Sequence, residues 1–309
     1  MKVAIIDMGT NTFNLLIAEV LQGGKFKKIY SDRVSVKLGE GSINKGFISS
    51  APYQRGLDAM IGYHNTIKHH DVKIIKAIAT AAIRSANNGH QFTQDIKSHT
   101  GIEVEVIQGD REAELIFKGA KHADSTNTND ALIMDIGGGS TEFIIVKNNE
   151  LVWKKSYPLG VSLLLQKFNP ENPIEKNTLL NIKSHLQESL YELVNNIAIH
   201  QPQILVGTSG SFDSFVDMLS ALHDTKAISD EQTNYEINLN HFFDLYNRVI
   251  SSTHDERKEM KGLIPMRIDM IVLSFILAKY IIEVSSVKHF FCCTYSLKEG
   301  ALIEIIESD

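Results

Sequence analysis

The 309-residue chain contains little that would place it in a membrane, outside the cell or on nucleic acid. Its two cysteines, Cys292 and Cys293, are adjacent, so we expect two small buried residues, no disulfide framework and a reducing, cytoplasmic location. No apolar run reaches the roughly 18 residues of a membrane span. The first residues, MKVAIID, enter a strand directly, so we expect no signal peptide. The net charge of −6 argues against a nucleic-acid surface.

What the chain does contain is one structural unit that occurs twice. Residues 3 to 20, VAIIDMGTNTFNLLIAEV, and residues 132 to 146, LIMDIGGGSTEFIIV, share an apolar strand ending in Asp, a turn of Gly and hydroxyl or amide residues, and a second apolar strand. Strands and helices alternate elsewhere, with a long helix expected over about 176–200, which indicates an α/β fold. The polar tract 124–130, DSTNTND, is the best candidate for a linker between the halves.

The two turns have the chemistry of a phosphate and metal site. Glycine lets the backbone turn sharply and brings N–H groups close to an anion, while Asp7 and Asp135 at the strand ends supply carboxylates for a metal ion. Two such hairpins that face each other across a cleft would grip one phosphate chain and one Mg²⁺ from both sides. Neither turn is a G-x-x-x-x-G-K-[ST] loop or a G-x-G-x-x-G dinucleotide turn.

Five motifs carry a resemblance to a known family. DMGTNTFNLLIAE, TAAIRSA, IQGDREAELIFKG, DIGGGSTEF and SLKEGAL occur in the order found in the exopolyphosphatase and guanosine pentaphosphate phosphohydrolase family. The chain resembles the short form of this family, which belongs to the actin-like ATPase superfamily. The resemblance implies two actin-like, ribonuclease H-like domains, expected at 1–123 and 124–309, with a ligand cleft between them. It also implies that the last helix, from about 298 to 309, packs back on the first domain.

The resemblance assigns roles to the residues that match its motifs. Glu112 takes the place of the general base, Arg84 that of an arginine that holds the terminal phosphoryl group, and Glu142 that of an acidic residue in catalysis and metal binding. The metal-associated residues are then Asp7, Asp135 and Glu142. The phosphate-binding residues expected from the loops are Gly9, Thr10, Asn11, Asn14, Gly137, Gly138, Gly139, Ser140 and Thr141, with Arg267 on the face of the second domain.

Three further positions complete the expected site. Ser209 and Gly210 lie in a turn between a strand and a helix, where they would either hold more phosphate or only cap the helix. Arg111 stands where the family usually has an acidic residue, which leaves a second carboxylate role there in doubt. Lys298 stands where the family often has arginine, which keeps the charge but loses the bidentate geometry.

The main functional expectation is a Mg²⁺-dependent exopolyphosphatase, with Mn²⁺ as an alternative ion, that releases orthophosphate from the end of inorganic polyphosphate. The alternative within the class is hydrolysis of the 5′-phosphate of guanosine pentaphosphate. More distant alternatives are a nucleotide-switched actin-like binding protein and a kinase of the sugar or acetate type. A homodimer is compatible with the resemblance, because family members often pair, although no residue requires it.

Overall fold

The computed structural model describes residues 1–41, 45–125 and 130–308, so the middle of the expected linker lies outside the described residues. The strands are β1 Lys2–Met8, β2 Thr12–Val20, β3 Phe26–Ser35, β4 Ile74–Ala79, β5 Val104–Val106, β6 Ala131–Ile136, β7 Thr141–Lys147, β8 Glu150–Tyr157, β9 Ile204–Thr208, β10 Asn234–Glu236 and β11 His289–Cys293. The α-helices are α1 Ser50–His69, α2 Ala81–Ser85, α3 Gly89–Thr100, α4 Gly109–His122, α5 Val161–Phe168, α6 Lys176–Ser189, α7 Tyr191–His200, α8 Gly210–His223, α9 Leu239–Ile250, α10 His254–Lys258, α11 Ile271–Ser285 and α12 Leu297–Ser308. Short 3-10 turns occur at Gln22–Gly24 and Pro265–Arg267.

The strands form two sheets with the same order, which confirms the α/β class and the actin-like duplication. The first sheet is five-stranded, in the order β3-β2-β1-β4-β5, and the second has the order β8-β7-β6-β9-β11 with β10 added at its edge. In both sheets the first three strands in chain order are antiparallel neighbours, and the next pairs are parallel. The chain passes from the first sheet to the second between Val106 and Ala131. The expected domain boundary near residue 123 stays a prediction.

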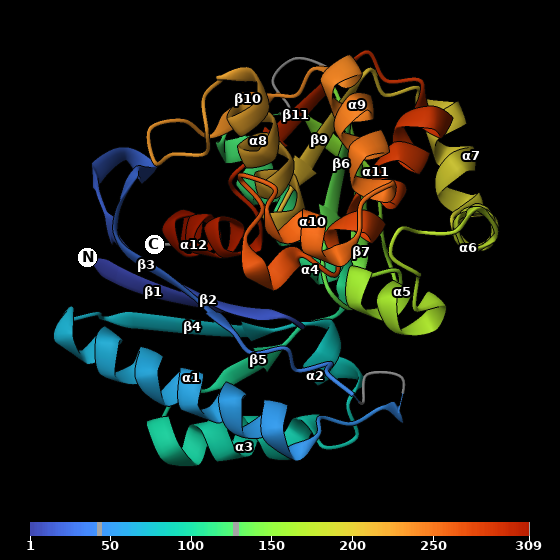
Figure 1. Cartoon of the computed structure of the whole chain (residues 1–309). Coiled ribbons are helices and arrows are strands. Elements are labelled where there is room, and N and C mark those ends of the chain that lie inside the picture. Colours follow the sequence, from blue (N-terminus) through green and yellow to red (C-terminus); the bar gives the residue numbers. More distant parts are fainter. Residues whose placement is uncertain (42–44, 126–129, 309) are drawn as a thin grey trace.

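Helices cover both faces of each sheet (Figure 1). Helices α1 and α3 lie on one face of the first sheet, α4 and α12 lie between the two sheets, and α5 to α11 cover the far face of the second. Within β1, Val3 and Ile5 enter the central core while Ala4 and Ile6 enter the core beneath α1. Because successive strand residues point to opposite faces, a strand buried on both sides has a continuous apolar sequence. This explains the two apolar runs that open the halves of the chain.

The two central helices cross at glycine. A Cβ on Gly300 of α12 would stand 1.8 Å from the carbonyl oxygen of Leu115 on α4, and a Cβ on Gly119 would stand 2.4 Å from the carbonyl oxygen of Ser296. Side chains at these two positions would therefore push the helices apart. The close crossing brings α12 against α4 and β1, and the two termini of the described chain lie near each other (Figure 1).

One expected element is wrong. The helix predicted over 176–200 is two helices, because α6 ends at Ser189 and α7 begins at Tyr191, with Leu190 fully buried at the joint. Ile182, Leu186 and Leu193 all enter the same core on the far face of the second sheet. Their spacing continues in helical steps across the interruption, so the apolar pattern alone does not reveal that the segment is two helices.

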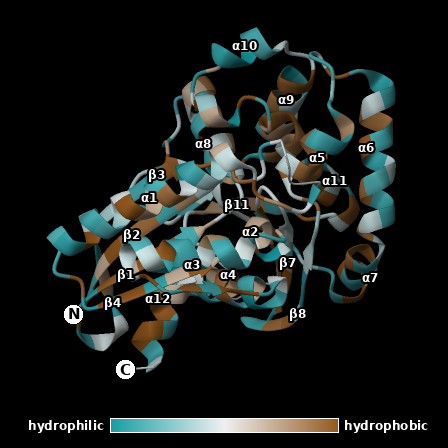
Figure 2. Cartoon of the chain, turned by 90° about the horizontal axis from the view of Figure 1, so that it is seen from below, coloured by the Kyte–Doolittle hydropathy of each residue, from teal (hydrophilic) through white to brown (hydrophobic). Residues whose placement is uncertain are grey.

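The apolar helix α11 belongs to that core, as its sequence indicated. Twelve of its fifteen residues are buried against the second sheet and its neighbouring helices. Within residues 1–41, 45–125 and 130–308, the helices lack the combination of length and hydrophobicity that a membrane span needs. Figure 2 shows the hydrophobic colour concentrated on inner strands such as β1 and β2, whereas the outlying α10 is hydrophilic. Cys292 and Cys293 are both fully buried, as expected.

Candidate active site

The two glycine turns have the same backbone geometry. The N–H of Gly9 donates to the carbonyl oxygen of Thr12 at 3.0 Å, and the N–H of Gly137 donates to the carbonyl oxygen of Ser140 at 3.0 Å. A Cβ at Gly9 or Gly137 would stand 3.1 or 2.9 Å from those same oxygens. A side chain would therefore crowd the first position of each turn, more severely at Gly137 than at Gly9.

The turns touch each other across the two halves of the chain. A Cβ on Gly138 would lie 2.6 Å from Nδ2 of Asn11, and a Cβ on Gly139 would lie 2.8 Å from Oγ1 of Thr10. The side chain of Asn11 also accepts a hydrogen bond from Oγ of Ser162 at 2.7 Å. Asn11 therefore joins the two halves, in addition to facing the cavity between them.

The start of α5 holds the second turn in place, which the sequence did not reveal. The N–H groups of Val161 and Ser162 donate to the carbonyl oxygens of Gly137 and Gly138 at 3.0 and 2.9 Å. Gly160 allows this approach, since its Cβ would stand 2.2 Å from the carbonyl oxygen of Gly138. Because these two carbonyl groups accept hydrogen bonds from the start of α5, protein atoms occupy that side of the turn.

A cavity of about 170 Å³ lies between the turns and gathers most of the expected site residues. Arg84 lines an adjoining cavity that shares Gly139 and Ser140 with the first. Thr141 is fully buried, and its hydroxyl donates to the carbonyl oxygen of Leu159 at 3.0 Å. It therefore stabilises the turn from inside and does not line the cavity. The expected residues that line the central cavity are Asp7, Gly9, Thr10, Asn11, Asn14, Glu112, Asp135, Gly137, Gly138, Gly139, Ser140, Ser209, Gly210 and Arg267.

Glu112 lies in the first turn of α4 and is 8 % exposed. Nη1 of Arg84 lies 3.4 Å from Oε2 of Glu112 and donates to the carbonyl oxygen of Ile107 at 2.7 Å. Burial, followed by the charge of Glu142, raises the pKa of Glu112 well above its usual value, and Arg84 opposes this. A carboxylate whose pKa is raised in this way is a stronger base than an ordinary glutamate.

Glu142 and Asp7 complete a buried group of acids. Glu142 is 1 % exposed and accepts a hydrogen bond from Oγ of Ser156 at 2.7 Å. Burial, followed by the charge of Asp135, raises the pKa of Glu142 to about 7. Burial also raises the pKa of Asp7 to about 6, against the charge of Lys298 and a hydrogen bond from Asn14. Acids this close together disfavour one another's charged forms, so the site attracts a cation.

Asp135 is held by three hydroxyl groups, of which only Ser209 was expected in the site. Thr208, Ser209 and Ser296 each donate to Oδ2 of Asp135, at 2.8, 2.7 and 2.6 Å, and Ser209 also lies 2.6 Å from Oδ1. Three donors on one carboxylate fix its orientation. Thr208 ends β9 and Ser296 immediately precedes α12, so isolated hydroxyl residues from separate segments meet here.

Ser209 has a strained backbone. Its φ of 71° and ψ of 176° lie in a region that glycine alone adopts readily, and such a conformation costs about 1–3 kcal/mol. The geometry directs its hydroxyl at both oxygens of Asp135. The sequence offered two interpretations of this turn, phosphate binding and helix capping. The structure adds a third, in which Ser209 orients Asp135, one of the expected metal-associated residues.

Arg267 packs on glycine. A Cβ on Gly210 would stand 1.8 Å from Nη2 of Arg267, so Gly210 makes room for the guanidinium group. Nη1 of Arg267 donates to Oγ of Ser214 at 2.7 Å, and burial lowers the pKa of Arg267 to about 10. Lys298 lines the same cavity and pairs with Glu299 at 2.9 Å. Arg111 lies outside the cavity, where it pairs with Glu114 and Glu304.

An actin-like fold that closes two glycine turns over buried carboxylates is suited to holding and cleaving phosphate groups, so the protein belongs to the class of phosphohydrolases. More closely, the chain belongs to the Ppx/GppA phosphatase family, which it matches over residues 16–309. Its activity class is that of a phosphoanhydride hydrolase, as the names of its relatives indicate.

Several relatives are similar over most of the chain. Exopolyphosphatase 1 of Mycobacterium tuberculosis is 24 % identical, over 100 % of this chain and 89 % of the relative. The bifunctional 3-dehydroquinate synthase/phosphatase of Fusobacterium nucleatum is 30 % identical, over 99 % of this chain and 46 % of the relative. The guanosine-5′-triphosphate,3′-diphosphate pyrophosphatase of Pseudoalteromonas translucida is 29 % identical, over 71 % of this chain and 44 % of the relative.

Solved structures agree with this family assignment. The crystal structure of an exopolyphosphatase from Cytophaga hutchinsonii has a TM-score of 0.96 and 35 % identity, and the similarity covers 100 % of this chain and 98 % of that one. The Ppx/GppA family member of Aquifex aeolicus has a TM-score of 0.83 and 21 % identity, over 100 % and 99 % of the two chains, and supports the fold.

Proposed function

We propose that this protein is a Mg²⁺-dependent exopolyphosphatase that hydrolyses the terminal phosphoanhydride of inorganic polyphosphate and releases orthophosphate. The observation that carries the proposal is the buried Glu112 carboxylate beside Arg84, at the place where the glycine turns of both halves meet. The similarity to exopolyphosphatases from Mycobacterium tuberculosis and Cytophaga hutchinsonii, each over the whole of this chain, supports the same substrate class.

In the proposed reaction, Glu112 acts as the general base. Water attacks the terminal phosphorus, Glu112 accepts the proton of that water, and the bond from phosphorus to the bridging oxygen breaks. The shortened chain leaves with that oxygen, and orthophosphate is released. The raised pKa of Glu112 supports this role, because it makes the carboxylate a stronger proton acceptor than an ordinary glutamate. Arg84 orients Glu112 and faces the phosphoryl group that is transferred.

The acidic residues fit Mg²⁺. Asp7 and Asp135 end matching strands on the two sides of the cavity and offer the oxygen ligands that this ion prefers. In the part of the chain that the structure describes, no three acidic, histidine or cysteine side chains converge to hold an ion by themselves. This suits Mg²⁺, which keeps several waters and shares the phosphate oxygens of its substrate. When bound, the ion would neutralise charge on those phosphate oxygens.

Hydrolysis of guanosine pentaphosphate is the second candidate. The relative from Pseudoalteromonas translucida, which is named for that type of substrate, matches 71 % of this chain. Both substrates present a terminal phosphoanhydride to the same cavity, so the geometry of Glu112 and Arg84 serves either.

Phosphate release from long-chain polyphosphate, guanosine pentaphosphate and ATP, each with Mg²⁺, Mn²⁺ or EDTA, tests the proposal. We expect release from polyphosphate that depends on the metal ion, with little release from ATP. Release from guanosine pentaphosphate alone would select the second candidate. Release from ATP alone, or from none of the three, would overturn the proposal and favour a nucleotide switch or a kinase.

A matched pair of variants tests the general base. Glu112→Gln should lower kcat by about 10²- to 10⁴-fold while polyphosphate still binds, because the base is lost and the shape is kept. Glu114→Gln is the control, since Glu114 pairs with Lys154 at 2.7 Å and with Arg111 at 3.1 Å, away from the cavity. Near wild-type turnover in Glu112→Gln would withdraw the role given to Glu112.

A further inference from the structure

The reaction cavity opens into a second cavity. The second one has a volume of about 530 Å³ and lies over β2, β3 and the segment that follows α8. The two cavities share the residues Asn14, Arg33, Asp213, Thr294 and Lys298, which therefore form the passage between them. A chain that extends from the reaction cavity into the second cavity must pass these side chains.

Two arginines from opposite halves of the chain meet at this passage on one carboxylate. Nη2 of Arg33, on β3, lies 3.6 Å from Oδ2 of Asp213, and Nη2 of Arg267 lies 3.9 Å from the same oxygen. The exposed fractions of the three side chains are 39 % for Arg33, 18 % for Asp213 and 15 % for Arg267. One negative charge thus lies between two positive charges, of which Arg267 is largely shielded from water and Arg33 is open to it.

Contacts with other residues hold both arginine side chains in place. Nε of Arg33 donates to Oδ1 of Asn14 at 3.1 Å, and Nδ2 of Asn14 donates to Oδ2 of Asp7 at 3.0 Å. Arg267 lies on Gly210 and donates to Ser214. A hydrogen-bonded chain therefore connects Asp7, in the reaction cavity, to the arginine at its exit. Guanidinium groups held in this way are suited to phosphate oxygens, which match their planar fork.

Resting on the proposed function, we propose that Arg33 and Arg267 form a second anion subsite, for the phosphates that follow the one being cleaved. Asp213 lies between the two arginines and acts as an internal competitor of the substrate. When polyphosphate binds, its phosphate oxygens replace the Asp213 carboxylate as the partner of the two arginines. Asp213 thereby weakens the binding of every anion that reaches the passage, and a longer chain, which contacts both arginines, overcomes it best.

The other charged side chains around the second cavity also have partners. Lys28 pairs with Asp230, Lys298 pairs with Glu299, and the carboxylate of Asp32 accepts the backbone N–H of Arg33 at 2.7 Å. Asp213 differs from these acids because it faces two arginines at once. Removing its charge leaves both guanidinium groups free for phosphate, and this makes Asp213 the position to test.

Binding experiments on the inactive Glu112→Gln protein isolate the subsite from catalysis. Calorimetric titration with long-chain polyphosphate, tripolyphosphate and orthophosphate should show tighter polyphosphate binding, by about fivefold, when Asp213→Asn is added. Orthophosphate binding should change less, since a single phosphate at the reaction position does not contact both arginines. Asp255→Asn, which removes a surface carboxylate paired with Lys258, is the matched control and should leave all three affinities unchanged.

A second variant makes the proposal testable even if Asp213→Asn does not fold. Arg33→Met, otherwise wild type, should raise KM for polyphosphate about tenfold while kcat changes little. Unchanged or weaker polyphosphate binding in Asp213→Asn, or an unchanged KM in Arg33→Met, would overturn the subsite. Polyphosphate binding that depends on Asp213 in a protein that fails to hydrolyse polyphosphate would instead refute the proposed function and leave the subsite standing.

Discussion

Glu304 should determine how firmly the C-terminal helix α12 stays attached. Its carboxylate accepts hydrogen bonds from Arg111 on α4, from Lys76 on β4 at 3.3 Å and from Lys118 on α4 at 3.3 Å. Burial alone would raise the pKa of Glu304, but the hydrogen bonds from Arg111 and Lys76 outweigh it and lower the pKa from 4.5 to about 2. The same helix carries Lys298, so its attachment also positions part of the active site.

The size of the effect follows from this pKa. Folding lowers the pKa of Glu304 by about 2.5 units. At 1.36 kcal/mol per pKa unit, this corresponds to about 3 kcal/mol before screening by solvent. Because the Glu304 side chain is 21 % exposed and its partners face solvent, screening reduces this to about 1–2 kcal/mol. A carboxyl group whose pKa is lowered by folding contributes its full stability above the unfolded pKa. The contribution is therefore lost as the pH falls from 4.5 towards 2.

Hydrogen exchange of the α12 backbone amides measures the attachment. At pH 7, Glu304→Gln should increase exchange by about 5- to 30-fold, the equivalent of 1–2 kcal/mol. The difference in protection between wild type and variant should fall to less than about half by pH 3. Glu307→Gln, at a 59 % exposed side chain that pairs with Lys118, is the control and should change exchange little. Equal exchange at pH 7, or a difference that does not vary with pH, would refute the electrostatic explanation.

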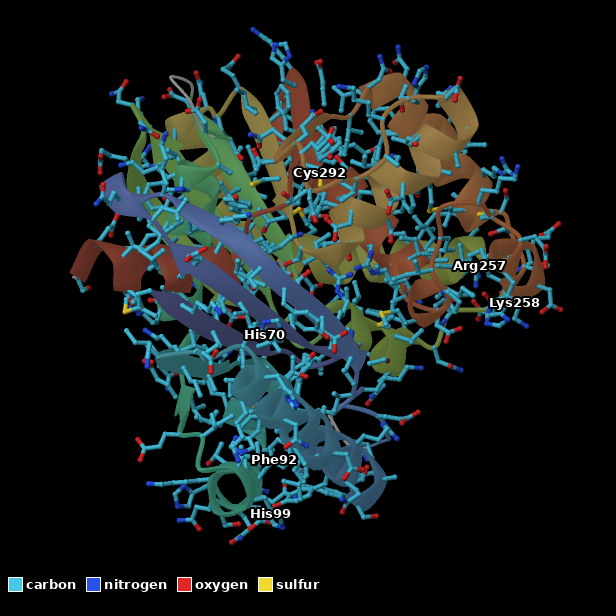
Figure 3. All side chains as sticks on the ribbon, turned by 90° about the vertical axis from the view of Figure 1, so that its left-hand side faces the viewer. His70, Phe92, His99, Arg257, Lys258 and Cys292 are labelled. Atoms are coloured by element: carbon cyan, nitrogen blue, oxygen red, sulfur yellow. The ribbon has the colours of Figure 1, made fainter. Side chains whose placement is uncertain are left out.

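Three further variants separate the site from the fold. Gly138→Ala should lower kcat/KM about 100-fold in steady-state kinetics. The reason is that the added Cβ would stand 2.6 Å from Nδ2 of Asn11 and push the two turns apart. Ser209→Gly should raise stability by about 1 kcal/mol in urea titration yet lower kcat/KM at least about tenfold, because relieving the strain also removes a donor to Asp135. Arg257 is buried in the part of the second half shown on the right of Figure 3 and donates to the carbonyl oxygens of Ser252 and Ile268, so Arg257→Met should cost about 2–4 kcal/mol of stability in urea titration.

The repeated unit could be predicted because its chemistry is local. An Asp at a strand end, a glycine turn and a returning apolar strand are consecutive in sequence, so one pattern contains strand, turn and ligand. The hydrogen bonds inside the Gly9 and Gly137 turns follow directly from that pattern. The contact between the two turns does not follow from it, since Asn11 and Gly138 are brought together only by the packing of α4 and α12 between the sheets.

The hydroxyl groups around Asp135 could not be predicted, for a related reason. Thr208 and Ser296 are single residues that end a strand or precede a helix, where such residues are common as caps and carry no signal of their own. Gly210 was expected either to bind phosphate or to begin a capped helix, and its contact with Arg267 was not expected. The role of a glycine depends on which distant side chain approaches it, and the sequence does not contain that information.

The duplication also explains how one fold separates binding from proton transfer. At the same register position, Asp7 lies opposite Asn14 on β2, whereas Asp135 lies opposite Glu142 on β7. Asn14 is neutral, donates to Asp7 and also accepts from Arg33, so the first half connects its aspartate to the arginine at the exit of the cavity. Glu142 instead adds a second acid beside Asp135, and its charge also raises the pKa of Glu112.

A single difference at this cross-strand position therefore gives the two hairpins distinct electrostatic environments. The hairpin with asparagine is hydrogen-bonded to an arginine, whereas the hairpin with glutamate carries an acid whose pKa burial raises to about 7. Exchanging the pair, as Asn14→Asp with Glu142→Gln, keeps the number of acids constant while moving one of them. If the asymmetry matters, this double variant should lose both polyphosphate affinity and turnover, as titration calorimetry and phosphate release would measure. Recovery of either property to the wild-type level would show that only the total charge counts.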